Sequence, residues 1–110
     1  MTLHQLTLPP YTDRYKSIHA RFRDFHAANP QVYAALVKLA RQAKARGHDT
    51  FGMKALFEIL RWEWKQMGVP PTKGDEFFLN NDFSTHYSEM IEAQEFGMKG
   101  FFVRRKRRAV

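Results

Sequence analysis

The sequence predicts a mainly α-helical fold, a small four-helix domain around a central buried helix. Apolar side chains recur at helical spacing in four segments, and proline, glycine or asparagine separates these segments. One segment, residues 53–64 (MKALFEILRWEW), is apolar on two sides. Hydrophobic residues make up 44% and aromatic residues 15% of the 110-residue chain, which is enough for one compact core. We therefore expect a single domain.

The central helix is predicted from residues 53–64, with Thr50 as its N-cap. Ile59 and Trp62 lie opposite its main apolar side, together with Ala55. A helix that is apolar on two sides is usually buried between neighbours, so burial of Ile59 and Trp62 is the favoured interpretation. The alternative is that both remain exposed as a patch for a partner. The main apolar side consists of Met53, Leu56, Phe57, Leu60 and Trp64.

The elements before this helix are an N-terminal arm and two helices. Residues 1–12 contain Pro9-Pro10 and are predicted as an irregular arm. A first helix is expected over residues 13–28, capped by Thr12 or Asp13. Asn29 and Pro30 then suit the cap and first position of a second helix, which runs to about residue 46 and ends at Gly47.

A loop over residues 68–82 follows the central helix, and residues 76–79 are expected to form a short strand. A fourth helix is predicted over residues 83–95, with Asn80, Asn81 and Asp82 as candidate caps. Residues 100–103 are expected to pair with 76–79 as a short C-terminal β-hairpin, in a winged-helix-like arrangement. The helical domain thus spans residues 13–103, and 104–110 form a basic tail.

The charge is uneven along the chain, whose formal net charge is +7. Residues 1–46 contain eight basic and two acidic residues, residues 47–100 contain five and nine, and residues 101–110 contain five and none. Basic ends suggest an anionic partner, most often nucleic acid, although a basic tail can serve solubility alone. We expect DNA-backbone binding through two helical faces and the tail, namely Lys16, Arg23, Lys38, Arg41, Lys44, Arg104, Arg105, Lys106, Arg107 and Arg108.

Two features argue against sequence recognition by the fourth helix. Its preceding loop of about 14 residues is much longer than the turn of a helix-turn-helix motif. Its outward side carries Glu89 and Glu92, which would repel phosphates. The alternative function is therefore a non-enzymatic inhibitor or adaptor that binds a host or defence protein. It would use the Ile59/Trp62 surface or the Glu89/Glu92 face, and a homodimer is also open.

Catalytic, metal and membrane functions find little support in the sequence. Cysteine is absent, and the five histidines show no metal-binding spacing. We expect neither an enzyme nor a cofactor, although a nuclease built from Asp82, Glu63 and Lys54 stays open. No apolar run is long enough to cross a membrane, and the N-terminus does not resemble a signal peptide. We expect a cytoplasmic protein.

Four blocks together resemble a family of small uncharacterised bacteriophage and prophage proteins. The blocks are 25–30 (FHAANP), 55–63 (ALFEILRWE), 79–83 (LNNDF) and 100–102 (GFF). Residues 95–98 depart from the pattern, where a proline-containing turn is more typical, and so does the very basic tail. No activity transfers from this family. The resemblance implies a bacterial host cell and a mobile-element setting, in which DNA-binding regulators and inhibitors of host machinery both occur.

Overall fold

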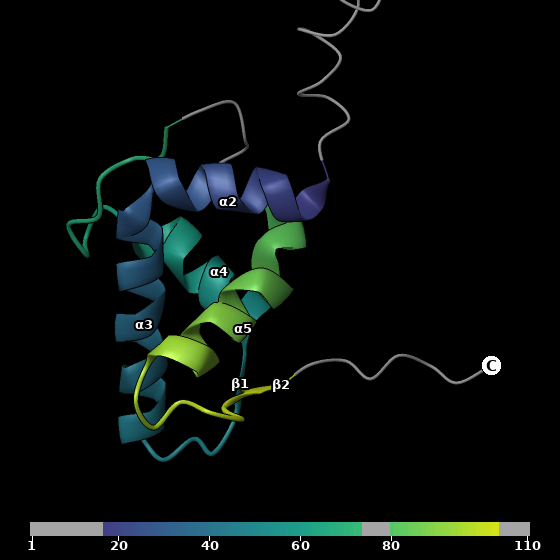
Figure 1. The fold of residues 1–110 in the computed structure, drawn as a ribbon. Coiled ribbons are helices and arrows are strands. Elements are labelled where there is room, and N and C mark those ends of the chain that lie inside the picture. Colours follow the sequence, from purple (N-terminus) through teal and green to yellow (C-terminus); the bar gives the residue numbers. More distant parts are fainter. Residues whose placement is uncertain (1–16, 74–79, 104–110) are drawn as a thin grey trace, which may run out of the picture.

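The computed structural model describes residues 17–73 and 80–103. Within these residues the chain is mainly helical, which confirms the predicted fold class. Four α-helices are joined by a 3₁₀ turn, η1, and two short strands (Figure 1). The elements are α2 (Ile18–Ala28), α3 (Pro30–Ala45), β1 (Phe51–Gly52), α4 (Met53–Glu63), η1 (Asn81–Phe83), α5 (Ser84–Gln94) and β2 (Phe102–Val103).

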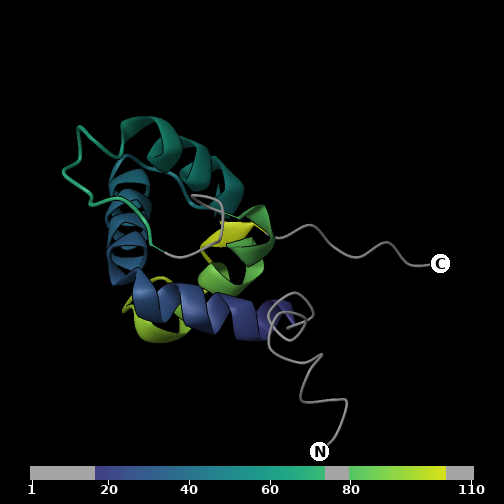
Figure 2. The same ribbon diagram turned by 90° about the horizontal axis from the view of Figure 1, so that it is seen from above.

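Helices α2 and α3 meet at an angle, and α4 and α5 lie within that angle (Figure 1). Figure 1 shows α2 running across the top of the molecule and α3 descending from its end. Helix α4 packs against α3 and α5, and η1 packs against α2. Seen from above, α4 and α2 lie on opposite sides of the molecule (Figure 2). Every described helix thus contributes to one core.

Helix α4 buries one side only. Met53, Leu56, Phe57 and Leu60 are buried, as predicted. The prediction that Ile59 and Trp62 are buried is wrong, because Ile59 is 37% and Trp62 is 78% exposed. Both neighbouring helices, α3 and α5, pack against the side that holds Leu56, Phe57 and Leu60. The opposite side of α4 is therefore left in solvent.

The corner between α2 and α3 is held by Asn29, but in a way that differs from the prediction. Pro30 begins α3 as expected, yet the Asn29 side chain makes no capping hydrogen bond. Its amide instead pairs with the backbone of Lys73. The Lys73 N–H donates to Asn29 Oδ1 at 2.6 Å, and Asn29 Nδ2 donates to the Lys73 carbonyl at 3.0 Å. Asn29 is buried, so these bonds compensate its lost hydration.

Two helix starts also differ from the prediction. Helix α2 begins at Ile18, because Ser17 is extended and its Oγ accepts from the Ala20 N–H at 3.1 Å. The expected caps Thr12 and Asp13 lie outside the described residues. Helix α4 begins after Gly52 rather than after Thr50, since the intervening residues form a strand.

The two strands pair in parallel, with Phe51 opposite Phe102 and Gly52 opposite Val103. The strand expected near residues 100–103 is therefore present. Among the described residues its partner is β1, and the pairing is not the predicted hairpin; residues 76–79 lie outside the described part. Gly97 and Gly100, which both have positive φ, turn the chain from α5 back toward β2. This pairing brings the C-terminal end of the domain to the start of α4.

Candidate functional site

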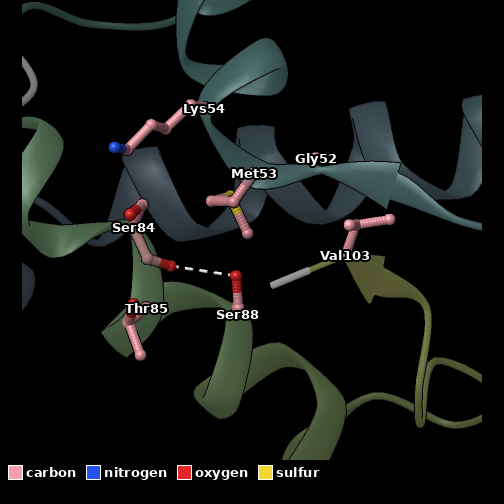
Figure 3. A pocket seen from close by; sticks show the side chains of 7 residues that line it. All are labelled: Gly52, Met53, Lys54, Ser84, Thr85, Ser88 and Val103. Atoms are coloured by element: carbon pink, nitrogen blue, oxygen red, sulfur yellow. Dashed lines mark hydrogen bonds between the residues drawn. The ribbon is translucent and has the colours of Figure 1, made fainter. Parts of the chain in front are cut away.

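A polar hollow lies where α4 and α5 begin and β2 ends. Its volume is about 500 Å³. Figure 3 shows it from close by, with the Lys54 side chain extending along one edge, above Ser84. We call this site the polar hollow. It is lined by Gly52, Met53, Lys54, Ser84, Thr85, Ser88 and Val103.

The hydroxyl groups of the polar hollow differ in what they offer a ligand. The Ser88 hydroxyl already donates a hydrogen bond within the protein. Its Oγ donates to the Ser84 carbonyl at 2.9 Å, shown as the dashed line in Figure 3. Ser88 itself is only 2% exposed. Thr85 is exposed and Ser84 is half-buried. Their hydroxyls and the Lys54 ammonium are the donors that a ligand in the hollow would meet.

A second hollow of about 420 Å³ adjoins the first and shares Lys54, Ser84 and Thr85 with it. Asp82 also lines this second hollow, so a carboxylate lies near the lysine. Glu63 lines a different groove, between α3 and α4. The nuclease set considered from the sequence, Asp82, Glu63 and Lys54, therefore does not line one common pocket.

The last described residue, Val103, lies at the polar hollow. Strand β2 ends at Val103, which forms part of the wall of the hollow, and Arg104 follows directly in the chain. The predicted tail residues 104–108 lie outside the described residues, as does Lys16. The polar hollow therefore lies at the end of the described domain, and five basic residues follow Val103 in the sequence.

Three of the predicted DNA-binding residues, Lys38, Arg41 and Lys44, form a basic ridge on α3, but two of them are engaged within the protein. Arg41 pairs with Glu95 Oε1 at 3.1 Å and also donates to the Phe96 carbonyl at 3.2 Å. Lys44 donates to the Gly97 carbonyl. These contacts hold the loop that follows α5 against α3. Lys38 is exposed on the same helix, and Arg23 is exposed on α2.

Glu95 is the centre of this loop attachment. The Tyr33 hydroxyl donates to Glu95 Oε2 at 2.8 Å. This hydrogen bond, together with the one from Arg41, holds the pKa of Glu95 below its ordinary value. Burial and the bond to Glu95 raise the pKa of Tyr33. The sequence did not single out Tyr33 or Glu95, because they are 62 positions apart and only folding brings them together.

The two glutamates predicted as an acidic face have separate environments. Glu89 is exposed, as expected. Glu92 is half-buried, and its Oε2 accepts from the Phe102 N–H at 3.0 Å. Glu92 thus anchors β2 to α5, so the face offered to a partner is less acidic than the sequence suggests.

The exposed side of α4 forms a second candidate surface. We call Ala55, Ile59 and Trp62 the apolar stripe; all three are exposed. A groove of about 290 Å³ between α3 and α4 adjoins Ile59. Leu39, Ala43, Phe51, Leu56 and Met67 contribute its apolar lining. Gln42, Arg46, His48 and Glu63 add polar groups to the groove, and an exposed apolar stripe beside such a groove is typical of a protein-binding face.

The described histidines do not assemble a metal site. Within residues 17–73 and 80–103 there is no group of three or more histidine, cysteine, aspartate or glutamate side chains that could hold a metal ion. His19, His26 and His86 instead contact aromatic rings between α2 and α5, with Phe22 and His86 stacked at a centroid distance of 5.0 Å. Burial lowers the pKa of His26, so the neutral ring is favoured.

None of the helices described here is both long and apolar enough to cross a membrane. Comparisons with protein-family models, with curated protein sequences and with solved structures give no match. The resemblance to bacteriophage proteins therefore stays a prediction. The function is therefore inferred from the polar hollow and the apolar stripe.

Proposed function

We propose that the protein is a small DNA-binding protein with a regulatory role that contacts the phosphate backbone. The observation that carries this proposal is the position of β2. Its last residue, Val103, lies in the wall of the polar hollow that Lys54, Ser84 and Thr85 also line, and the basic run 104–108 follows Val103 in the sequence. Lysine, serine and threonine side chains are common phosphate ligands in protein–DNA complexes.

The order of the elements supports this surface as the DNA-facing one. A strand precedes α4, a second helix follows, and a strand after α5 returns to pair with the first. This order resembles a winged-helix domain, in which the N-terminal residues of the second helix approach DNA. In α5 these residues include Ser84 and Thr85, which line the hollow. Because Glu92 is turned toward β2, one of the two repelling carboxylates is removed from this surface.

The α3 ridge would contribute less than its sequence suggests. Lys38 and Arg23 are exposed and could meet a phosphate. Arg41 already has a carboxylate partner, and Lys44 already donates to a carbonyl. A phosphate that recruits either residue must compete with these internal bonds. We therefore expect Lys54 and the tail to dominate DNA affinity.

The test is titration of labelled duplex DNA with the full chain at rising salt concentrations. The logarithm of affinity should fall linearly with the logarithm of salt, with a slope of about −0.9 per phosphate neutralised. Removal of residues 104–110, which include five basic residues, should reduce the steepness by about 4.5, and Lys54→Gln should reduce it by about 0.9. Thr85→Ala should weaken binding without changing the slope, because a hydroxyl releases no counterion.

Lys99→Gln is the matched control for Lys54→Gln, because Lys99 is exposed in the loop after α5 and does not line the hollow. It should leave the slope nearly unchanged. If the full chain does not bind duplex DNA at low salt, or if loss of the tail leaves the slope intact, the DNA proposal fails.

A second candidate function has its own supporting observation, the 78% exposure of Trp62. An exposed tryptophan beside an apolar groove is typical of an interface anchor. The protein would then act as an inhibitor or adaptor that binds a host protein through the apolar stripe. A pull-down from nuclease-treated host lysate tests it: a specific partner lost with Trp62→Ala supports the candidate, and identical capture by both proteins contradicts it.

A further inference from the structure

The apolar stripe on α4 is a surface feature of the described residues that the DNA proposal does not explain. Trp62 is 78% and Ile59 is 37% exposed, and Ala55 extends the same stripe by one turn. A solvated indole on a helix offers a large apolar area that a partner can bury. The question is which partner fits the charges that border it.

On one edge of the stripe the exposed charges, Glu58 and Lys65, have opposite sign, while Glu63 lies on the other edge. Glu58 and Lys65 are seven positions apart, which is about two helical turns, so they lie on the same side of Trp62. The helical path continues past the end of α4, since Trp64 has helical backbone angles and the Met67 N–H donates to the Glu63 carbonyl at 2.9 Å. Both side chains are exposed. The other edge is the apolar groove beside Ile59.

This pattern is self-complementary under a two-fold axis. When two copies of one helix pack antiparallel, like edges face each other and every contact occurs twice. A register that places Glu58 opposite Lys65 has its midpoint between residues 61 and 62. Trp62 then lies beside the axis and meets Trp62 of the second copy, while the apolar grooves face each other along the opposite edge.

We propose that the apolar stripe binds a second copy of this chain, with the two α4 helices antiparallel and Glu58 of each paired with Lys65 of the other. Glu58 already accepts from Arg61 at 2.5 Å, and its carboxylate has capacity for a second donor. Unlike an unspecified host protein, a second copy supplies the required opposite charges at the required spacing. The inference does not depend on DNA binding. It proposes that the apolar stripe, on which the second candidate function rests, binds a second copy of the chain.

The first measurement is sedimentation velocity of the full chain over a wide concentration range. We expect a monomer–dimer equilibrium in the native protein. Trp62→Ala should weaken the dimer by about tenfold or more, because a central tryptophan is a typical hot spot. Because Trp62 is exposed, the melting temperature should be unchanged at concentrations where both proteins are monomeric, which separates loss of the interface from loss of the fold.

Charge reversal tests the register. Glu58→Lys alone and Lys65→Glu alone each create two like-charge contacts across the axis, so each should weaken the dimer. The double variant, Glu58→Lys with Lys65→Glu, restores both pairs with reversed sign and should recover most of the affinity. Lys99→Glu makes the same charge change as Lys65→Glu on an exposed residue outside α4 and should leave dimerisation unchanged.

A protein that stays monomeric at all concentrations overturns the inference, as does a dimer insensitive to Trp62→Ala. Failure of the double variant to recover affinity overturns the antiparallel pairing. A monomer that captures a host protein through Trp62 also overturns it, but leaves the second candidate function standing. Loss of dimerisation with unchanged DNA affinity per monomer supports the inference and keeps it separate from the DNA proposal.

Discussion

The basic ridge of α3 and the apolar stripe of α4 show the same kind of sequence pattern. In the folded protein, contacts within the chain engage most of the ridge but leave the stripe exposed. Both are sets of similar side chains repeated at helical spacing. The ridge resembles a surface for a partner, yet Arg41 and Lys44 bind the chain's own loop at residues 95–97. The stripe resembles core, yet Trp62 lies in solvent. Periodicity therefore identifies which side chains share a side of a helix, but not what covers that side.

The largest expected effect separates the two sides of α4. Phe57→Ala removes a fully buried ring and should lower the free energy of unfolding by about 3–5 kcal/mol. Trp62→Ala removes an even larger side chain from the exposed side and should change it by no more than about 0.5 kcal/mol. Chemical denaturation measures both. A comparable loss for Trp62→Ala would mean that the stripe is covered within the monomer, and the contrast drawn above would disappear.

A smaller expected effect, on the melting temperature, distinguishes Arg41 from Lys38 within the basic ridge. Arg41→Ala removes both the ion pair with Glu95 and the bond to the Phe96 carbonyl, so the melting temperature should fall measurably. Lys38→Ala changes an exposed side chain of the same helix and should leave the melting temperature nearly unchanged. High salt should reduce the difference between the two variants. Equal melting temperatures would show that the loop contact contributes nothing to stability.

The smallest expected effect is on the pH dependence of stability, through the hydrogen bonds that Glu95 accepts from Tyr33 and Arg41. The bond from Tyr33, followed by that from Arg41, lowers the pKa of Glu95 below its ordinary value of 4.5. The stability that Glu95 contributes is therefore fully present above pH 4.5 and is lost as the pH falls through its lowered pKa. Tyr33→Phe should melt below the native protein at pH 7. The difference in melting temperature between the two proteins should become smaller in acid, and thermal melts at pH 7, 5, 4 and 3 would measure it. A difference that is constant with pH would contradict this role for Glu95.

Local signals in the sequence predicted much of the fold. Asn29-Pro30 marked the start of α3, and Gly47 marked its end with a positive φ. The role of Asn29 itself was not predictable, because its amide pairs with Lys73, 44 positions away. The polar hollow was missed for the same reason. Lys54 and Ser84 stand at the starts of separate helices, and only the packing of α4 on α5 makes them neighbours.

The sequence by itself determined the helices, their turns and the main buried side of α4, because these follow from interactions within a few residues of one another. Only the tertiary structure decided which sides of those helices are covered, that β2 pairs in parallel with β1, and that the ridge holds a loop. These outcomes depend on contacts between residues that are distant in the chain. The covering of a helix side depends on how many neighbours pack against that helix, and local periodicity carries no information about their number or place.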